Sequence, residues 1–427
     1  MKKLINRMIL TAALLAAAPL ALHAAPSFSG AIGGSAGVGF DIPLSNGESD
    51  FRVPLAGFAA VQANITDWCV ARGELAIDTR NFEFDDIFGS AESSIKLNEL
   101  SIVLIRRAVT LASFFSGFLG SYEQIGGDAF LMRQFAIEPI CSRLSKSATN
   151  LAGVPILRTK GAGLSYIVKF DKAPIATGAY FYVGKNTDKD WTLNADARFA
   201  YVSNLVTLDV LFGASTPLQD KYNDEDVVLM IDTICLHGGA SFLAGSKYTH
   251  SLFMQFGIKD FAVKGGNNEE LAGDAINFLF EPRINFKKFR MNITAFAYDE
   301  ETYKETIYLP NEFGAAVTFY KDDIETKRGY LTLGIHTIFG IGGKKFLDYF
   351  REFNKEDDSN NGSNSGSNSA TESETKDATY NVYITPFAEI PLSRSASLEA
   401  MAQIGVCDIS GDMSLNFKIT ASARKTF

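Results

Sequence analysis

Hydrophobicity that alternates at every second residue is the feature that most constrains this chain. Over residues 191–201 one set of positions is apolar and the set between them is largely polar: Trp191, Leu193, Ala195, Ala197, Phe199 and Tyr201 against Thr192, Asn194, Asp196, Arg198 and Ala200. The same alternation recurs over residues 276–287 and 415–424. A period of two places the two sets on opposite faces of a β-strand. The pattern therefore predicts a chain built from strands with two different faces.

Two features distinguish a membrane-spanning barrel from a soluble β-sandwich, whose strands also alternate. The polar face carries full charges in mid-strand, as at Arg72 with Glu74 and at Glu281 with Arg283. The apolar face is aliphatic, with aromatic residues such as Trp68 near the strand ends. A transmembrane barrel has both features, and only a closed barrel pairs every backbone group of a strand in lipid. We therefore expect an all-β, transmembrane, antiparallel up-and-down β-barrel.

The connections between strands give the number of strands. Bacterial barrels alternate short periplasmic turns with long extracellular loops. Counting back from a final strand at 413–427 gives about 18 strands, or about 16 without the hairpin over 95–119, whose turn lacks a turn residue. No plug domain is expected, because the first strand begins within a few residues of Ala25. The expected outer loops are 41–51, 80–94, 120–159, 184–190, 215–234, 262–274, 299–311, 341–378 and 408–412, and the expected turns include 106–107 and 322–327.

Residues 1–24 have the composition of a signal peptide. Lys2, Lys3 and Arg7 precede an apolar run over 8–22, and small residues offer a cleavage site near Ala24. The run is shorter than the roughly 20 residues of a transmembrane helix, and no later apolar run reaches about 18 residues. The pattern therefore predicts export, with residues 25–427 forming the barrel, and excludes a helical inner-membrane protein.

The composition excludes several other classes of protein. With 40 Lys and Arg against 49 Asp and Glu, the chain lacks the basic balance of a nucleic-acid-binding protein. His237, His250 and His336 show no metal-type spacing with acidic residues and no convincing nucleophile, so neither an enzyme nor a metal or other cofactor is predicted. The four cysteines are compatible with a disulfide in an oxidising compartment, and their pairing stays open: Cys69, Cys141, Cys235 and Cys407.

The end of the chain resembles that of Gram-negative outer-membrane proteins. Leu415, Phe417 and Ile419 alternate toward a terminal aromatic residue, Phe427, although Lys425 stands where a hydrophobic residue would be usual. With the signal peptide and the series of strands, essentially the whole mature chain resembles the porin-like outer-membrane family. The resemblance implies location in the bacterial outer membrane, Phe427 as an assembly signal and the barrel-assembly machinery as a partner. Porins of this size are commonly trimers, so a homotrimer is one expected assembly.

Two sets of residues are candidates for the pore. In classical porins the loop after the fifth strand folds into the barrel, and the resemblance implies this for 120–159; an extracellular lid is the alternative. The candidate constriction residues are Glu123, Asp128, Arg133, Glu138 and Arg143. The wall residues expected to line the pore are Arg72, Glu74, Lys169, Asp196, Arg198, Asp209, Glu281 and Arg283. A barrel of this size leaves an aqueous channel, so these charges are expected to stay hydrated, with opposed charges biasing ion selectivity.

Passive diffusion of small hydrophilic solutes through a water-filled lumen is the predicted function. One alternative is a substrate-specific uptake channel for hydrophobic or oligomeric solutes, with a lumen made apolar by the run over 108–119. Another is a surface adhesin or structural barrel. Its candidate binding segment is 354–377, which is rich in Ser, Asn and Gly and is expected to be a disordered extracellular loop.

Overall fold

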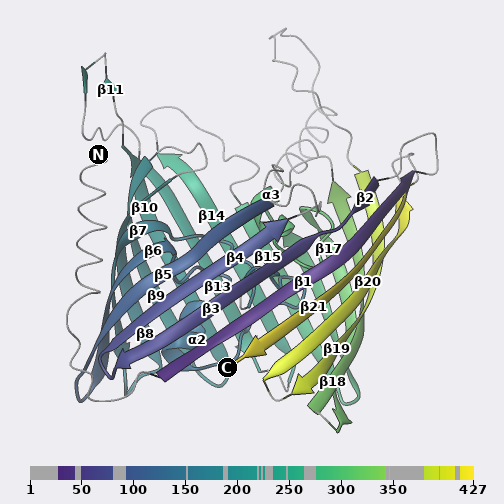
Figure 1. The fold of residues 1–427 in the computed structure, drawn as a ribbon, viewed down its shortest axis with the longest axis horizontal. Coiled ribbons are helices and arrows are strands. Elements are labelled where there is room, and N and C mark those ends of the chain that lie inside the picture. Colours follow the sequence, from purple (N-terminus) through teal and green to yellow (C-terminus); the bar gives the residue numbers. More distant parts are fainter. Residues whose placement is uncertain are drawn as a thin grey trace, which may run out of the picture.

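The strands predicted from alternation form one closed barrel (Figure 1). The computed structural model describes residues 27–43, 50–79, 93–150, 152–185, 191–218, 221–222, 225–226, 234–246, 249–263, 276–327, 329–342, 346, 379–393, 395–408 and 414–427. The predicted signal peptide and the 354–377 segment lie outside these residues. No helix in the described part of the chain is long and apolar enough to cross a membrane.

The barrel consists of eighteen antiparallel strands among the described residues. They are β1 (Ser27–Pro43), β3 (Leu55–Thr66), β4 (Cys69–Thr79), β5 (Ser93–Arg107), β6 (Leu111–Ser121), β7 (Lys160–Phe170), β8 (Ile175–Lys185), β9 (Trp191–Val202), β10 (Val206–Pro217), β13 (Ile234–Gly245), β14 (Ser251–Val263), β15 (Ile276–Phe286), β16 (Phe289–Ala297), β17 (Phe313–Thr326), β18 (Gly329–Gly342), β19 (Thr379–Ser393), β20 (Ala396–Asp408) and β21 (Ser414–Thr426). β2 (Asp50–Arg52) pairs with the end of β1, and β11 (Lys221–Tyr222) and β12 (Glu225–Asp226) form a separate small hairpin.

Pairing between the first and last strands closes the sheet. Ala31 of β1 lies opposite Thr426 of β21, and the pairing continues to Pro43 opposite Ser414. On its other edge β1 pairs with β3 from Ser27 to Ala36. Every other barrel strand pairs with its two neighbours in sequence, which is the predicted up-and-down order.

Apolar side chains cover the outside of the barrel, and polar side chains point into it. In β9 the even-numbered residues 192–200 are buried, whereas odd-numbered residues such as Trp191, Leu193 and Phe199 are exposed. Leu75 of β4 and Phe212 of β10 are likewise exposed. This is the arrangement of a barrel whose outer surface faces lipid. No plug domain is present among the described residues.

The structure differs from the prediction at two turns and at one loop. β5 continues through Arg107, and the chain turns over 108–110, where the N–H of Ala108 donates to the carbonyl of Leu111 (2.8 Å). β17 continues through Thr326, past a bulge in which Asp323 has φ of 60°. The connection over 299–311, predicted to be an outer loop, packs within the barrel, where its apolar side chains join the buried cluster. Alternation shows which face of a strand is apolar, but it does not show where a connection folds.

Candidate functional site: two inner loops and the lumen

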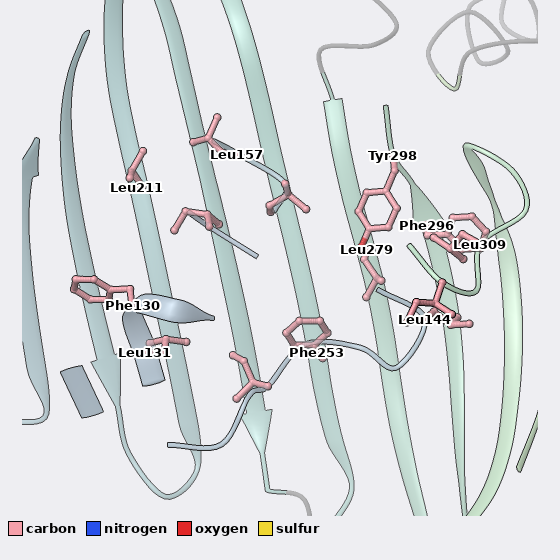
Figure 2. Packing of buried hydrophobic residues seen from close by; sticks show 14 of the residues in the cluster. Phe130, Leu131, Leu144, Leu157, Leu211, Phe253, Leu279, Phe296, Tyr298 and Leu309 are labelled. Carbon is pink, nitrogen blue, oxygen red and sulfur yellow. The ribbon is translucent and has the colours of Figure 1, made fainter. Parts of the chain in front are cut away.

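Residues 122–150 and 152–159, here called the first inner loop, fold into the barrel. They include helix α2 (Ala129–Phe135), and their apolar side chains pack against inward-facing residues of the wall. Figure 2 shows Phe130, Leu131 and Leu144 of this loop with Leu211, Phe253, Leu279 and Phe296 of the strands. All seven are at most 1% exposed. The hydrophobic core of this protein therefore lies in the lumen of the barrel.

Glycines in the wall let the first inner loop approach the strands closely. A Cβ atom on Gly257 of β14 would lie 3.0 Å from the carbonyl oxygen of Ile156. A Cβ on Gly239 of β13 would lie 3.3 Å from Cβ of Leu157 and 3.4 Å from Cγ2 of Ile125. Because glycine has no side chain, the wall and the loop pack more closely here than most residues would allow without a small shift of the loop.

A buried ion pair anchors the start of the loop. Nε and Nη2 of Arg198 donate to the two carboxylate oxygens of Asp209, at 2.8 and 2.6 Å. Nη1 of Arg198 donates to the carbonyl of Glu123, and its guanidinium lies 4.1 Å from the ring centroid of Phe130. The Glu123 carboxylate accepts a hydrogen bond from the hydroxyl of Tyr180 (3.0 Å). The wall thus holds the loop through both its backbone and its side chains.

A second anchor lies on β15. Glu281 accepts hydrogen bonds from Ser142 of the loop, from Thr294 (2.8 Å) and from Nε of Arg283 (2.7 Å). Nη2 of Arg283 also donates to the carbonyl of Ile140 (3.0 Å). Glu281 is only 1% exposed, so its charge is balanced by these donors rather than by water.

A third anchor joins the loop to β19 and β20. Nη1 of Arg143 lies 3.1 Å from the Glu389 carboxylate. Nζ of Lys146 lies 2.8 Å from Glu399 and 3.4 Å from Glu389. The guanidinium of Arg143 also lies 4.8 Å from the ring centroid of Tyr320. These contacts fix the middle of the loop to β19 and β20.

The side chain of Asp128 joins two parts of the first inner loop. Its Oδ2 accepts the backbone N–H groups of Ile140 and Cys141, each at 2.8 Å. Asp128 has a left-handed backbone conformation (φ 57°) and is 2% exposed. Burial raises the pKa of Asp128 to about 6, in spite of the two N–H donors.

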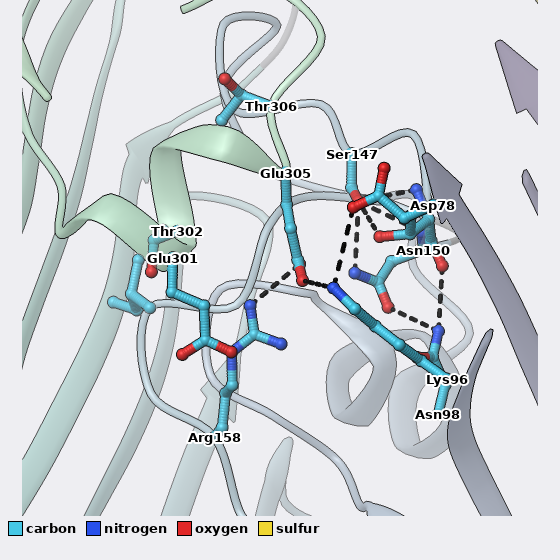
Figure 3. A network of polar contacts seen from close by, with 12 residues as sticks. Asp78, Lys96, Asn98, Ser147, Asn150, Arg158, Glu301, Thr302, Glu305 and Thr306 are labelled. Atoms are coloured by element: carbon cyan, nitrogen blue, oxygen red, sulfur yellow. Dashed lines mark hydrogen bonds and ion pairs between the residues drawn. The ribbon is translucent and has the colours of Figure 1, made fainter. Parts of the chain in front are cut away.

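Residues 298–312, here called the second inner loop, pack onto the first. Helix α3 (Glu300–Lys304) begins after Asp299, whose side chain accepts the N–H of Thr302 (2.6 Å). In Figure 3, Lys96 of β5 and Arg158 of the first inner loop converge on Glu305, at 3.2 and 2.9 Å. Burial alone would raise the pKa of Glu305, but these two cations outweigh it and hold the pKa below its ordinary value.

The hydroxyl of Tyr308 binds the wall beyond this network. It donates to the Glu399 carboxylate, and Nε2 of Gln403 donates to the carbonyl of Tyr308 (2.8 Å). Burial raises the pKa of Tyr308 well above its ordinary value. The second inner loop is therefore anchored to β20 as well as to the first inner loop.

The first inner loop leaves a cavity of about 540 Å³ against the wall. Strands β1, β3, β4 and β5 border it on one side and the first inner loop on the other. Its charged residues are Arg72, Glu74, Glu99, Glu123 and Arg133. Nη2 of Arg133 lies 2.6 Å from Glu99, and Nδ2 of Asn98 donates to Glu74 (2.9 Å). We call this space the larger cavity.

A second cavity, of about 140 Å³, lies farther along β1, β3 and β21. Its charged residues are Lys146, Glu389, Glu399 and Arg424. Ser147, Ala148 and Ile307 of the inner loops also border it. We call this space the smaller cavity.

The predicted site residues fall into distinct groups in the structure. Two of the eight predicted wall residues, Arg72 and Glu74, border the larger cavity. Two of the five predicted loop residues, Glu123 and Arg133, border it as well. The expectation that the wall charges stay hydrated is wrong for four of them, which are at most 5% exposed: Asp196, Arg198, Asp209 and Glu281. Half-buried Lys169 lies 5.6 Å from the ring of Phe135, and Glu138 is exposed.

The histidines, the cysteines and Phe427 occupy separate places. Nε2 of His237 lies 2.8 Å from Asp196, and Nδ1 of His336 lies 2.7 Å from the Thr318 hydroxyl. His250 accepts the N–H of Asn285 (3.2 Å). Cys69 lies in β4 and Cys141 in the first inner loop, and these two form no disulfide. The backbone of Phe427 exchanges two hydrogen bonds with Gly30, extending the closing pair of strands.

Several residues of the site were not predicted from the sequence. Glu99, Lys146, Glu305 and Arg424 each contact the inner loops or a cavity. Alternation over β5 and β21 places Glu99 and Arg424 on the inward face, which was an available signal. Nothing in the local sequence places Glu305 inside the barrel, because its position depends on how the second inner loop folds.

Comparisons with known proteins find similar backbone structures only. No family model matches the chain, and no curated protein sequence is similar to it. Salmonella typhi OmpF in complex with daunomycin aligns with 11% identity over 93% of this chain and 97% of its own, at a TM-score of 0.41. Pseudomonas putida OprB aligns with 11% identity over 94% of each chain, at a TM-score of 0.43. Acinetobacter baumannii OccAB4 aligns with 9% identity over 94% of this chain and 98% of its own, at a TM-score of 0.45.

Proposed function

We propose that the protein is a porin of the bacterial outer membrane, through which small hydrophilic solutes diffuse passively. The larger cavity is the observation that carries this proposal, because it is a space inside a closed barrel that charges of both signs border. The apolar outer surface of the barrel supports a position in lipid. The proposed role is a channel and not an enzyme.

The charges of the larger cavity would act on passing solutes. Arg72 on the wall and Arg133 on the loop are basic, whereas Glu74, Glu99 and Glu123 are acidic. Charges of opposite sign around a narrow aqueous passage bias ion selectivity. We assign the pore-lining role to Arg72, Glu74, Glu123 and Arg133. The buried Arg198, Asp209 and Glu281 would instead hold the constriction loop in place.

The structure favours neither alternative function. Phe114 and Phe118, which the 108–119 run places on the inward face, pack against the first inner loop, while Phe115 and Leu119 are exposed on the outer face. An open apolar path for hydrophobic solutes therefore has no support from this run. The adhesin alternative depends on 354–377, which lies outside the described residues.

Export and assembly complete the proposal. We propose that the chain is exported with cleavage near Ala24 and is inserted by the barrel-assembly machinery, with Phe427 as part of the signal. A homotrimer is the proposed assembly. Mass determination of the protein in detergent, together with chemical cross-linking, would show whether it forms trimers.

Recording from planar lipid bilayers tests the channel. We expect stepwise ion conductance from the mature protein, after a gel with and without boiling has confirmed a folded barrel. Glu74→Gln should shift the reversal potential toward anion selectivity and Arg72→Gln toward cation selectivity, since each removes one charge from the cavity. Deleting residues 354–377 should leave conductance unchanged. A folded barrel without stepwise conductance would overturn the proposed function.

A further inference from the structure

Basic side chains predominate at the end of the barrel where β1 begins and β21 ends, which is the end of the C-terminus in Figure 1. The exposed basic residues in or beside its turns are Arg107, Lys172, Lys287, Lys288 and Lys327. Three more are exposed near the ends of strands: Arg106, Lys321 and Lys425. Against them, the exposed acidic residues described at this end are Asp67, Asp171, Asp323 and Glu325. The chain as a whole carries a net charge of −9, so this end has the opposite sign.

The cations near the strand ends lie on the outer surface of the barrel. Arg106 follows Leu104 by two residues in β5, and Lys321 follows Phe319 by two residues in β17. A separation of two keeps a side chain on the same face of a strand. Leu104 and Phe319 are exposed on the apolar outer surface, so the two cations continue the lipid-facing rows of these strands.

Lys425 is the residue at which the chain departs from the usual pattern of an outer-membrane C-terminus. It lies opposite Ile32 of β1, which is exposed on the outer surface, and therefore projects outward beside it. The cost of a charge on the lipid-facing surface falls toward the edge of the bilayer. A lysine at this position thus fits the level of the lipid head groups and not that of the acyl chains.

No acidic side chain in the described part of the chain forms an ion pair with Arg106, Lys321 or Lys425. Half-buried Arg290, at the same end, lies 3.0 Å from the Asp322 carboxylate and 3.6 Å from that of Asp323. The nearby acidic groups thus belong to a pair within the protein. The outward cations are available to anions from outside it.

Two hydroxyl groups lie on the outer surface beside Arg106. Ser113 of β6 lies directly opposite Arg106, and directly opposed residues have Cβ atoms about 4.5–5.5 Å apart. The hydroxyl of Tyr166 in β7 donates to Oγ of Ser113 (3.2 Å). Because Oγ of Ser113 accepts this bond, its own hydrogen can be donated to a further acceptor. A guanidinium matches two oxygens of a phosphate, and the Ser113 hydroxyl can reach the same group.

We propose that this end of the barrel binds anionic phospholipids of the surrounding leaflet. Arg106 and Ser113 hold one lipid phosphate, Tyr166 orients the Ser113 hydroxyl, and Lys321 and Lys425 attract further head groups. Short turns mark the periplasmic side of a bacterial barrel, so the lipids are those of the periplasmic leaflet. Basic residues near a membrane surface are attracted to anionic lipid. The inference requires the barrel to lie in lipid, but it does not require solutes to pass through the lumen.

Native mass spectrometry of the folded protein in a nonionic detergent tests the inference. We expect the wild type to retain phosphatidylglycerol in preference to phosphatidylcholine, which has a phosphate but no net charge. Arg106→Gln should weaken the retention of phosphatidylglycerol by about fivefold. Ser113→Ala should weaken it by about threefold without changing the charge of the barrel. Lys160→Gln removes a charge from an exposed residue at the opposite end of β7 and is the matched control, which should behave as wild type.

Equal retention of the two lipids by the wild type would overturn the inference, as would equal effects of Arg106→Gln and Lys160→Gln. A preference for lipopolysaccharide or for peptidoglycan fragments over phosphatidylglycerol would also overturn it, because these ligands come from other sources. If Arg106→Gln gives no heat-modifiable barrel, the double variant Lys321→Gln, Lys425→Gln should lower the number of phosphatidylglycerol molecules retained. A barrel that retains the lipid but does not conduct would contradict the porin and leave the lipid site intact.

Discussion

Arg424 and Phe58 contact each other across a strand that contains no side chain at the point where they meet. They belong to β21 and β3, both of which pair with β1, and Gly33 of β1 lies between them. The guanidinium carbon is 5.5 Å from the ring centroid. The contact therefore depends on Gly33, because a side chain at this position would occupy the space between Arg424 and Phe58.

Filling that space should destabilise the barrel. Gly33→Ala places a Cβ where Phe58 now lies, so we expect a loss of about 1–3 kcal/mol in the free energy of unfolding, typical of overpacking. Urea unfolding of the refolded barrel, followed by tryptophan fluorescence, measures it. Gly73→Ala in β4 is the control, because a Cβ there meets no atom within 4 Å. Equal effects of the two substitutions would contradict the steric role of Gly33.

The ion pair between Arg198 and Asp209 should contribute far more to stability than an exposed pair. Asp209→Ala leaves the buried guanidinium without its carboxylate, which costs about 3–5 kcal/mol in comparable cases. Glu300→Ala removes the exposed partner of Lys304 one turn away in α3 and should cost no more than about 0.5 kcal/mol. Urea midpoints of the two variants test this. Because Arg198 also binds the carbonyl of Glu123, we further expect Asp209→Ala to increase proteolysis of the first inner loop.

Asp128 should make the protein less stable as the pH rises. Its pKa is raised by burial from 3.8 to about 6, so the folded state keeps a proton that the unfolded state loses between pH 4 and 6. Stability contributed by this group is full below about pH 4 and is lost as the pH rises through 6. Asp128→Asn should therefore be more stable than wild type at pH 8, by about 1–3 kcal/mol, with no gain at pH 4. A gain of the same size at both pH values would contradict the prediction.

Glu305 should show the opposite dependence on pH. Its pKa is held below the ordinary value, so its contribution is present above about pH 4.5 and is lost as the pH falls through the lowered value. Glu305→Gln should destabilise the barrel at pH 7, and the difference from wild type should shrink in acid. The unfolding midpoint as a function of pH measures this, with Asp128→Asn as a comparison of opposite sign. A difference that grows in acid would exclude the assigned ion pairs with Lys96 and Arg158.

A charge introduced on the outer surface should report the position of the membrane. Leu75 lies in the middle of β4 and is 53% exposed, so Leu75→Arg should cost about 2–4 kcal/mol in lipid. Leu205, in the turn between β9 and β10, is 67% exposed, and Leu205→Arg should cost no more than about 1 kcal/mol, since the cost falls toward the interface. Folding yield into lipid vesicles compares the two. Equal yields would argue against lipid contact at Leu75.

Local sequence was sufficient for the strands but not for the contents of the barrel. Alternation correctly placed β9 and β15, and loop lengths gave the higher of the two predicted strand counts, including the hairpin of β5 and β6. The sequence also assigned Arg198 and Glu281 to the inward face. It could not show that they are buried, because burial depends on a loop that folds onto them from a different part of the chain. For the same reason, the position of Glu305 and of the second inner loop inside the barrel could not be predicted from the local sequence.

Glycine between two partners occurs a second time in the wall. Gly213 of β10 pairs with Asp196 on one side and His237 on the other, and those side chains meet over it at 2.8 Å. In both rows a glycine in the middle strand lets side chains of the two flanking strands meet along the inner wall. The inner surface of the wall can therefore be altered by single substitutions while the number and pairing of the strands stay the same.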